Sequence, residues 1–185
     1  MKATTEAATS IDQDALTAPA KLVEPYLEGW LDERSLPGNL REAIRYSLLG
    51  PGKRMRPILV IRSCEAVGGE AEQALAPAAA IEMIHAFSLV HDDLPAMDDD
   101  DLRRGRPTLH RHASEAMAIL AGDGMMALAV ELVTTRVGDA TLARRLVHEL
   151  VVGTNDMIAG QVYDTLGEFE ETTPGLEKLH TITET

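Results

Sequence analysis

Apolar residues recur every three or four positions along most of this chain, which is the spacing of one face of an α-helix. The first such run contains Leu22, Val23, Tyr26, Leu27, Trp30 and Leu31. Pro37-Gly38 ends this run, and Gly50-Pro51-Gly52 ends the next one. The pattern predicts further helices over residues 41–50, 55–69, 70–93, 113–136, 140–153 and 155–169, with a last short helix beginning at Pro174.

Local signals refine the helix boundaries. Asn39 is a candidate cap of the second helix, and Pro57 falls in the first turn of the third. Pro77 is expected in the first turn of the main Ala-rich helix, and the Gly122-Asp123-Gly124 step is expected to interrupt the helix that contains it. No alternation of Val, Ile and Thr is long enough for a strand. We therefore predict an all-α fold.

No segment has the composition of a targeting or membrane-spanning sequence. Residues 1–20 contain one Lys, three acids and no apolar block, so we expect a disordered leader before a single domain over residues 21–185. The longest apolar stretch, from Ala74 to Val90, is interrupted by Glu82 and His85, which argues against a membrane span. These features predict a cytoplasmic protein.

The charge balance limits the possible partners. The chain carries 30 acidic and 17 basic residues, for a net charge of −13, so it is not expected to bind nucleic acid. Its basic residues gather only around residues 41–62 and 103–106, which favours small anions over a polynucleotide. Cys64 is the single cysteine, which excludes an intrachain disulfide and a cysteine-based metal site.

The most informative stretch reads HDDLPAMDDDDLRRGRPTLH, from His91 to His110, with six aspartates and three arginines. On an uninterrupted helix Asp98 would lie about 120° around the axis from Asp92. Pro95 ends or bends the helix, however, so the following turn can bring Asp98 back beside Asp92 and Asp93. Carboxylates clustered without Cys or His are hard oxygen ligands and predict a Mg²⁺ site.

The simpler interpretation of this stretch is a solvated acidic turn capped by arginines. Three neighbours favour a site instead: the apolar helix that precedes the aspartates, the RRGRPT segment that follows, and a second basic segment, GPGKRMRP, at residues 50–57. The glycines of GPGKRMRP allow close approach to an anion, and Lys53, Arg54 and Arg56 follow where the next helix begins. Arginine and lysine there match phosphate oxygens.

Together these segments resemble the trans-isoprenyl diphosphate synthases, the family of farnesyl and geranylgeranyl diphosphate synthases. HDDLPAMDDDDLRRGRPT is similar to the family's first aspartate-rich motif, and GPGKRMRP to its GGKRxRP box. The segments ILAGD and GQVYD also have counterparts in the family. The resemblance implies an isoprenoid-synthase-type helical bundle around a central cavity, usually in a homodimer, with Mg²⁺ as the cofactor.

The resemblance also assigns roles to individual residues. Asp92, Asp93 and Asp98 would hold Mg²⁺ that bridges the allylic diphosphate, which Arg103 would contact. Isopentenyl diphosphate would be bound by Lys53, Arg56, His85 and Arg104. Gln161 would flank the reacting carbons as a catalytic group, and Asp164 would lie on the metal-bound side as a further metal ligand.

Product length is expected to depend on the residues one helical turn before the first aspartate pair. Phe87 and Ser88 lie five and four positions upstream of Asp92. An aromatic side chain there would block a growing prenyl chain, which the family associates with a short product. The resemblance therefore favours farnesyl diphosphate over geranylgeranyl diphosphate as the product, made from a dimethylallyl or geranyl diphosphate acceptor.

The chain departs from the family pattern near its C-terminal end. The second aspartate-rich motif is missing, and Asp164 and Glu168–Glu171 are too scattered to replace it. We therefore expect a fragment that lacks the C-terminal helices of the fold and turns over little substrate by itself. Two other interpretations remain open: a class I terpene cyclase, and a non-catalytic regulatory or structural subunit. A cyclase binds one diphosphate, so the GPGKRMRP segment and His85 favour the synthase.

Overall fold

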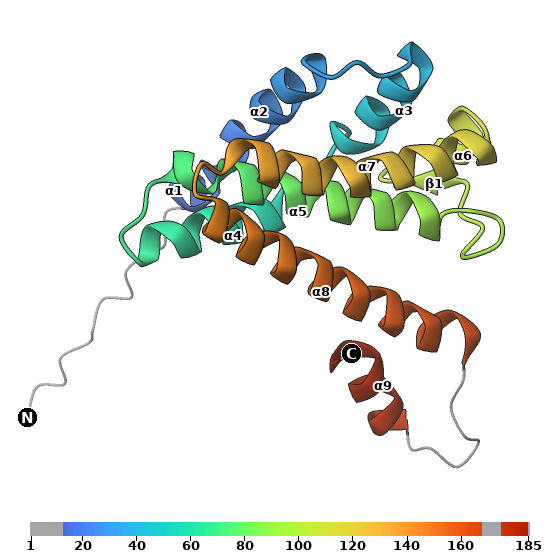
Figure 1. Cartoon of the computed structure of the whole chain (residues 1–185). Helices are drawn as coiled ribbons and strands as arrows, with labels where there is room; N and C mark the ends of the chain where they lie inside the picture. The colour runs from blue at the N-terminus through green and yellow to red at the C-terminus, as the bar shows by residue number, and fades with distance from the viewer. Residues whose placement is uncertain (1–12, 168–174, 185) are drawn as a thin grey trace, which may run out of the picture.

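The computed structural model describes residues 13–167 and 175–184 of the chain, and these residues are mostly helical (Figure 1). The helices are α1 (Gln13–Thr17), α2 (Ala20–Asp32), α3 (Gly38–Leu48), α4 (Met55–Ala66), α5 (Ala71–Asp92), α6 (Leu109–His112), α7 (Glu115–Arg136), α8 (Ala140–Leu166) and α9 (Gly175–Glu184). Two very short strands, β1 (Leu102–Arg103) and β2 (Arg106–Pro107), lie between α5 and α6. The predicted all-α fold is confirmed.

Helices α5 and α7 lie side by side at the centre of the molecule (Figure 1). α5 contacts α7 and α4 most extensively, and α2, α3 and α8 cover the remaining sides of this pair. The fully buried large side chains include Leu27, Leu31, Ile44, Leu48, Ile61, Met83, Met125 and Leu132. Small alanines on α5 and α7 let the two central helices approach closely, so a core with few aromatic residues still packs densely.

The central helices are apolar on nearly every face, as expected for helices that are covered all round. By length and composition alone, α5 and α7 are each capable of crossing a membrane. In the most apolar 18-residue stretch of each helix, 61% of the residues of α5 and 44% of those of α7 are buried inside the structure. The core helices of a globular protein can have the same length and composition as membrane spans. The absence of a membrane span therefore stays a prediction.

Three predicted helix interruptions are wrong. Pro77 lies inside the continuous helix α5, not in its first turn. Helix α7 runs through the Gly122-Asp123-Gly124 step, and α8 is a single helix of 27 residues where we expected two. Packing against neighbouring helices outweighs the local cost of glycine or proline in these segments.

The predicted helix ends are mostly correct, with small differences. Residues Gln13–Thr17, within the expected leader, form a short helix, and residues 1–12 lie outside the described residues, so the disordered leader stays a prediction. α3 begins at Gly38 after Pro37, and Asn39 accepts a bond from the adjacent Leu40 N–H and does not cap the helix. Pro57 lies in the first turn of α4, as predicted. Pro174 lies outside the described residues, and α9 begins immediately after it.

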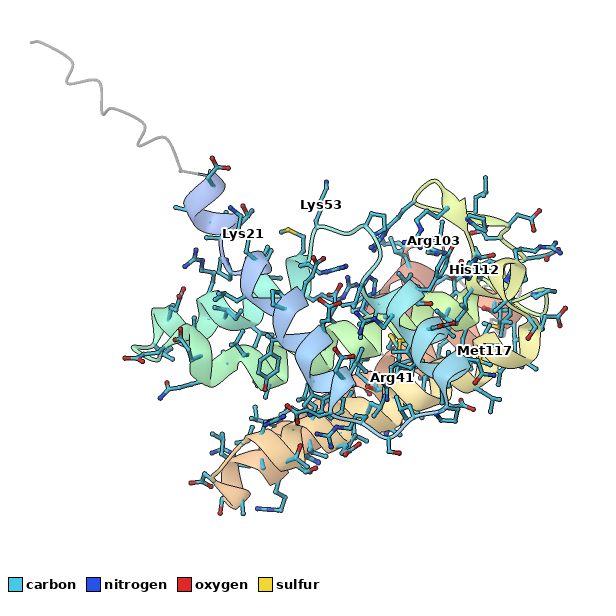
Figure 2. The ribbon with its side chains drawn as sticks, turned by 90° about the horizontal axis from the view of Figure 1, so that it is seen from above. Lys21, Arg41, Lys53, Arg103, His112 and Met117 are labelled. Atoms are coloured by element: carbon cyan, nitrogen blue, oxygen red, sulfur yellow. The ribbon has the colours of Figure 1, made fainter. Side chains whose placement is uncertain are left out.

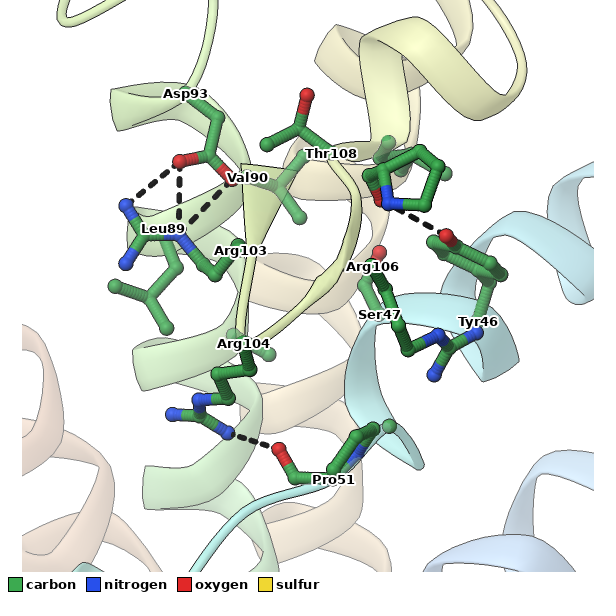
Figure 3. Close-up of a pocket in the computed structure, with 14 residues that line it drawn as sticks. Tyr46, Ser47, Pro51, Leu89, Val90, Asp93, Arg103, Arg104, Arg106 and Thr108 are labelled. Atoms are coloured by element: carbon green, nitrogen blue, oxygen red, sulfur yellow. Dashed lines mark hydrogen bonds and ion pairs between the residues drawn. The ribbon is translucent and has the colours of Figure 1, made fainter. Parts of the chain in front are cut away.

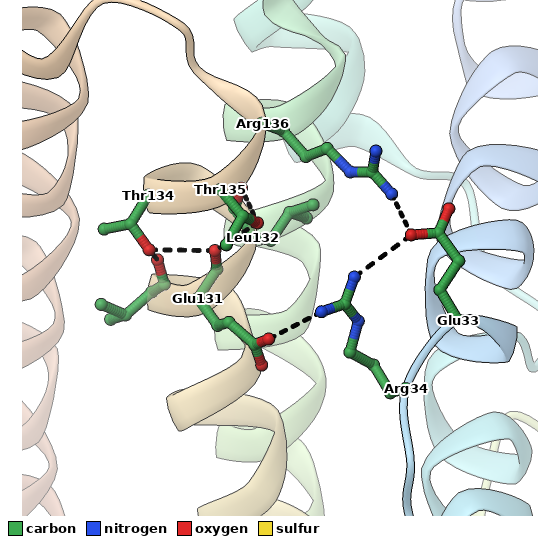
Figure 4. A network of polar contacts seen from close by, with 8 residues as sticks. Glu33, Arg34, Glu131, Leu132, Thr134, Thr135 and Arg136 are labelled. Atoms are coloured by element: carbon green, nitrogen blue, oxygen red, sulfur yellow. Dashed lines mark hydrogen bonds and ion pairs between the residues drawn. The ribbon is translucent and has the colours of Figure 1, made fainter.

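A polar network fixes the turn after α2 to the far end of α7 (Figure 4). Arg34 Nη1 donates to Glu131 Oε1 at 2.8 Å, and the Arg34 guanidinium lies 4.5 Å from the centre of the Trp30 ring. Glu33 accepts from both Arg34 and Arg136. This network holds α2 and α3 against the central pair, at the end of the bundle opposite the aspartates.

Candidate active site

The acidic segment forms a compact turn at the end of α5. The N–H of Asp98 donates to the carbonyl oxygen of Asp92 at 2.9 Å, and the N–H of Asp99 donates to that of Leu94 at 3.1 Å. These bonds satisfy carbonyl groups that a helix end leaves free. The turn through Pro95 therefore brings Asp98 back to Asp92, as the sequence predicted.

Asp92 and Asp98 form the acidic pair of this turn. Burial, and next the negative charge of Asp98, raise the pKa of the half-buried Asp92 carboxyl above its usual range. The negative charge of Asp98 thus makes Asp92 less favourable as an anion. A divalent cation between them would relieve this repulsion.

Asp93 does not join the acidic pair. Consecutive helical positions point about 100° apart, and the Asp93 side chain, only 4% exposed, faces Arg103 (Figure 3). Arg103 Nε donates to both Asp93 oxygens, at 2.8 and 3.0 Å, and Arg103 Nη2 lies 2.6 Å from Oδ1. The hydrogen bond with Asp93 raises the pKa of the Arg103 guanidinium.

This ion pair changes the predicted metal site. Among residues 13–167 and 175–184, no three His, Cys, Asp or Glu side chains are grouped so that they could hold a metal ion. The expected three-carboxylate arrangement is therefore not formed, because Arg103 engages Asp93. The Asp92–Asp98 pair still fits Mg²⁺, which typically takes one or two protein carboxylates together with phosphate oxygens of its substrate.

The three arginines after the acidic turn lie on or beside a small hairpin. Strands β1 and β2 are antiparallel, with Leu102 opposite Pro107 and Arg103 opposite Arg106. Arg104 and Gly105 form the turn in left-handed conformations, with φ of 54° and 77°. The expectation of no strand is thus wrong here, since two-residue strands are too short to show an alternating pattern.

Consecutive arginines of the hairpin face different neighbours (Figure 3). Arg103 contacts Asp93 beside the acidic turn, whereas Arg104 Nη1 donates to the carbonyl oxygen of Pro51 at 2.7 Å. The hairpin therefore connects the acidic turn to the basic loop of residues 50–56.

Tyr46 on α3 contacts the hairpin from the other side, and no sequence pattern indicated this contact. Its hydroxyl donates to the carbonyl oxygen of Pro107 at 2.8 Å, across 61 positions of sequence. The Arg106 guanidinium lies 4.1 Å from the centre of the Tyr46 ring, and His112 stacks on that ring with 3.8 Å between centres. Such contacts fix the hairpin without touching the acidic turn.

The predicted isopentenyl diphosphate ligands gather around one depression. Its volume is about 480 Å³, and its lining residues include Lys53, Arg56, His85 and Arg104. Lys53 projects outward from the loop (Figure 2), and Arg56 is also exposed. The structure therefore brings together the four residues that the sequence singled out, from the loop before α4, the first turn of α4, helix α5 and the hairpin.

His85 lies beside this basic depression in its neutral form. Burial lowers the pKa of its imidazole to about 4, and the nearby positive charges of Arg56 and Arg104 add to this shift. A neutral imidazole can both donate and accept a hydrogen bond. His85 would thus bind a phosphate oxygen as a hydrogen-bond donor without adding a charge.

An apolar cavity of about 410 Å³ lies between α5 and α8. It is lined by Phe87, Ser88, His91, Ala96, Met97, Met157, Ile158, Gln161, Val162, Thr165 and Leu166. The residues predicted to limit product length and the predicted catalytic Gln161 thus line the same cavity. Asp164 is exposed on α8 and is not among the lining residues, so the structure does not bring it to the acidic pair.

Comparison with known proteins identifies the family. The family model described as polyprenyl synthetase matches residues 37–185. The chain belongs to the polyprenyl synthetase family. In this polyprenyl synthetase chain, one helical bundle carries the acidic turn, the basic loop and the apolar cavity.

Similar proteins include synthases of different product length. A farnesyl diphosphate synthase from Bacillus subtilis is 43% identical over 169 residues, which cover 89% of this chain and 56% of that protein. The chloroplastic geranylgeranyl pyrophosphate synthase 7 from Arabidopsis thaliana is 49% identical over 150 residues, 79% of this chain and 43% of that protein. This polyprenyl synthetase chain therefore spans about half the length of the curated relatives it matches.

Solved structures of similar proteins share the fold. An FPP/GFPP synthase from Zymomonas mobilis superposes with a TM-score of 0.85 at 34% identity, covering 93% of this chain and 64% of that one. A geranyltransferase from Legionella pneumophila gives a TM-score of 0.82 at 38% identity, covering 92% and 61%. The isoprenoid-synthase-type helical fold predicted from the sequence is confirmed.

Proposed function

We propose that this protein is a Mg²⁺-dependent prenyltransferase. It condenses isopentenyl diphosphate with an allylic diphosphate, dimethylallyl or geranyl, to form a short-chain trans-prenyl diphosphate. One observation carries the proposal: consecutive hairpin arginines, Arg103 and Arg104, serve two adjacent regions, one acidic and one basic. Two adjacent regions suited to diphosphates are what a condensation of two diphosphate substrates requires.

The residues of the chain support each part of this reaction. Arg103, beside the acidic pair, would stabilise negative charge on the allylic diphosphate as its carbon–oxygen bond breaks. A Mg²⁺ ion held by Asp92 and Asp98 would neutralise further charge on that leaving group. Lys53 and Arg56 would hold the second diphosphate through charge, and the neutral His85 through a hydrogen bond.

The apolar cavity supports the carbon chemistry. As the allylic carbon–oxygen bond breaks and diphosphate leaves, the isopentenyl double bond attacks the allylic carbon and a carbon–carbon bond forms. The released diphosphate then accepts the proton that the new cation loses. Phe87, Met97 and Ile158 supply an apolar lining that excludes water from such a cation. Gln161 lines the same cavity, which supports its assignment beside the reacting carbons. Its side-chain amide donates to Thr165 Oγ1 at 3.2 Å.

Farnesyl diphosphate is the product we favour. Phe87 is only 6% exposed, lies one helical turn before Asp92, and lines the apolar cavity. A ring in this position shortens the space available to a growing prenyl chain. The relatives include both farnesyl and geranylgeranyl synthases, so this preference depends on Phe87.

We also propose a homodimer in the cytoplasm. Two exposed apolar side chains of α8 that do not line the apolar cavity, Val151 and Val152, support a protein partner. The single Cys64 agrees with a reducing compartment. The net charge of −13 opposes binding to nucleic acid.

Titration calorimetry of the chain with inorganic pyrophosphate, with and without Mg²⁺, tests the proposal. We expect two classes of site: one that requires Mg²⁺ and is lost in Asp92→Asn, and one that is independent of Mg²⁺ and is lost in Lys53→Met. A single Mg²⁺-dependent site would instead favour a terpene cyclase. Metal binding that ignores pyrophosphate would favour a non-catalytic subunit and overturn the proposal.

A further inference from the structure

The middle arginine of the basic loop is buried, unlike its neighbours. Lys53 and Arg56 are exposed, whereas the Arg54 side chain is only 3% exposed. Arg54 directly precedes α4 and has a left-handed conformation, with φ of 51° and ψ of 36°. This conformation is uncommon for residues other than glycine, so surrounding contacts must hold it.

Arg54 makes those contacts with three different parts of the chain. Its Nη1 donates to Glu82 Oε1 on α5 at 3.1 Å, and its Nη2 donates to Glu24 Oε1 on α2 at 2.7 Å. Nη2 also donates to the carbonyl oxygen of Gly50 at 2.6 Å, where the basic loop begins. The Glu82 side chain is only 6% exposed, so the Arg54–Glu82 pair is shielded from water.

Because Arg54 points inward, only Lys53 and Arg56 of the basic loop are available to bind an anion. Both terminal nitrogens of Arg54 already donate to the protein, and its Nε is buried without a partner among the described residues. Arg54 is therefore poorly placed to bind an anion in the depression. Its inward direction instead leaves Lys53 and Arg56 facing outward from the same loop.

We propose that Arg54 and Glu82 are positioning residues that fix the basic loop in its diphosphate-binding shape. This inference rests on the proposed function for its ligand, and on the buried ion pair for its structural part. Arg54 links the start of the loop, α2 and α5, so Lys53 and Arg56 are held around the depression before a ligand arrives. Preorganisation of this kind increases affinity because less ordering remains to be done on binding.

The charge of Glu82 makes the proposal easy to distinguish from a simple electrostatic effect. Glu82 lines the basic depression, so its negative charge by itself opposes the binding of an anion. Removing that charge should therefore tighten pyrophosphate binding if Glu82 has no positioning role. The proposal predicts the opposite result, since Arg54 would lose its buried partner and the loop would loosen.

The test compares Glu82→Gln with the matched variant Glu72→Gln, which removes the same charge from the exposed first turn of α5. Hydrogen exchange of loop residues 50–56 and calorimetry with inorganic pyrophosphate in the absence of Mg²⁺ are measured for both. In Glu82→Gln we expect exchange about tenfold faster and pyrophosphate binding about tenfold weaker, the size of a lost charge-assisted hydrogen bond. Glu72→Gln should change neither by more than about twofold.

Two results would overturn the proposal: loop exchange as slow in Glu82→Gln as in the unmodified chain, or tighter pyrophosphate binding. Arg54→Lys provides a second test, because it keeps the charge but cannot reach both glutamates with a forked group. It should show the same loosening, and full affinity with slow exchange would equally overturn the proposal. If the unmodified chain binds no pyrophosphate, the proposed function fails, and loop exchange alone decides whether the pair fixes the loop.

Discussion

Asp92 and Asp93 are neighbours in the sequence but have opposite electrostatic surroundings. Asp92 is half-buried beside Asp98, and burial together with that second carboxylate raises its pKa. Asp93 is almost fully buried and forms a two-pronged ion pair with Arg103. Asp92 is therefore disfavoured as an anion in the folded protein without a cation, whereas Asp93 already has a cationic partner in Arg103.

We predict that Asp92→Asn stabilises the metal-free chain while it removes Mg²⁺-dependent pyrophosphate binding. The raised pKa means that ionised Asp92 costs stability, and this cost grows as the pH rises above the usual carboxyl pKa. After allowance for solvent screening, the gain is about 0.5 kcal/mol. Thermal unfolding at pH 7 should show the midpoint about 2 °C higher.

Asp93→Asn is the matched control for that substitution. It leaves Arg103 without its buried partner, so we expect a loss of about 2 kcal/mol, less than for a fully buried pair because Arg103 is partly exposed. If both variants unfold at lower temperature by the same amount, the contrast between the two aspartates is wrong.

For His85 we predict an imidazole pKa of about 4, set by burial and the surrounding arginines. The unfolded value is about 6.5, so stability from the neutral ring is fully present above pH 6.5 and is lost as the pH falls from 6.5 to 4. NMR titration measures the value directly, and His85→Gln should flatten this part of the stability profile. Pyrophosphate should raise the pKa of His85, because the anion offsets the arginine charges.

Phe87→Ala is predicted to lengthen the product in catalytically active protein. Removing the ring deepens the cavity between α5 and α8, which leaves room for another five-carbon unit. Chromatography of the products should show a lower ratio of C15 to C20 chains. Phe87→Leu keeps most of the volume and should change the ratio far less, whereas an unchanged ratio in Phe87→Ala would exclude Phe87 as the limiting side chain.

At the scale of helices, the contact between α5 and α7 depends on one glycine. A Cβ on Gly122 would lie 2.1 Å from His91 Nε2, and that nitrogen is 3.1 Å from the carbonyl oxygen of Ile119. Gly122 therefore leaves the space in which His91 reaches α7. Since His91 precedes Asp92 directly, this contact also fixes the end of α5 that carries the acidic pair.

Gly122→Ala should destabilise the chain by about 1–3 kcal/mol, as overpacking of a core does. Gly124→Ala is a close control, because a Cβ there would make an ordinary contact of 3.6 Å with Ile44. Alanine in a helix interior is favoured over glycine by about 0.5–1 kcal/mol, so Gly124→Ala should be neutral or stabilising. Denaturant unfolding of both variants measures the difference, and equal effects would contradict the packing role of Gly122.

Sequence periodicity predicted which segments are helical but not where the helices are continuous. Pro77 and the Gly122-Asp123-Gly124 step have the local chemistry of helix ends, yet both lie within helices. Their neighbours compensate for that local cost, and a pattern read within one helix contains no information about its neighbours. The hairpin was not predicted for a different reason: strands of two residues are too short to show an alternation of apolar and polar residues.

The sequence predicted which residues make up the candidate site, but not which side chains form ion pairs with one another. Pro95 correctly indicated that Asp98 returns to Asp92, and the basic depression contains the expected side chains. The sequence did not indicate that Asp93 would turn toward Arg103, since an aspartate can satisfy either a cation or an arginine. It also placed Arg54 with the outward basic residues, because its left-handed backbone is not visible in the residue type.

At the scale of the whole molecule, an acidic protein presents a basic depression beside an acidic turn. The net charge of −13 repels anions. The attraction of an anion to the arginines of the depression has to outweigh this repulsion. A ligand that carries its own divalent cation reduces the repulsion. Mg²⁺ and diphosphate should therefore bind cooperatively and not independently.

Thermal unfolding in the presence of both ligands tests this expectation. Saturation at a hundred times the dissociation constant stabilises a protein by about 2.7 kcal/mol per site. We expect Mg²⁺ alone to change the midpoint little, pyrophosphate alone to raise it moderately, and the two together to raise it by more than the sum. Strictly additive shifts would show that the acidic pair and the anion are not coupled through the metal.

The short hairpin links the two regions that are suited to bind diphosphate. Arg103 and Arg104 lie on the same short hairpin, which the Tyr46 hydroxyl holds through its hydrogen bond to Pro107. A ligand that draws one guanidinium away from its resting partner must shift the other guanidinium as well. A diphosphate bound in either region should therefore alter how quickly a ligand leaves the other region.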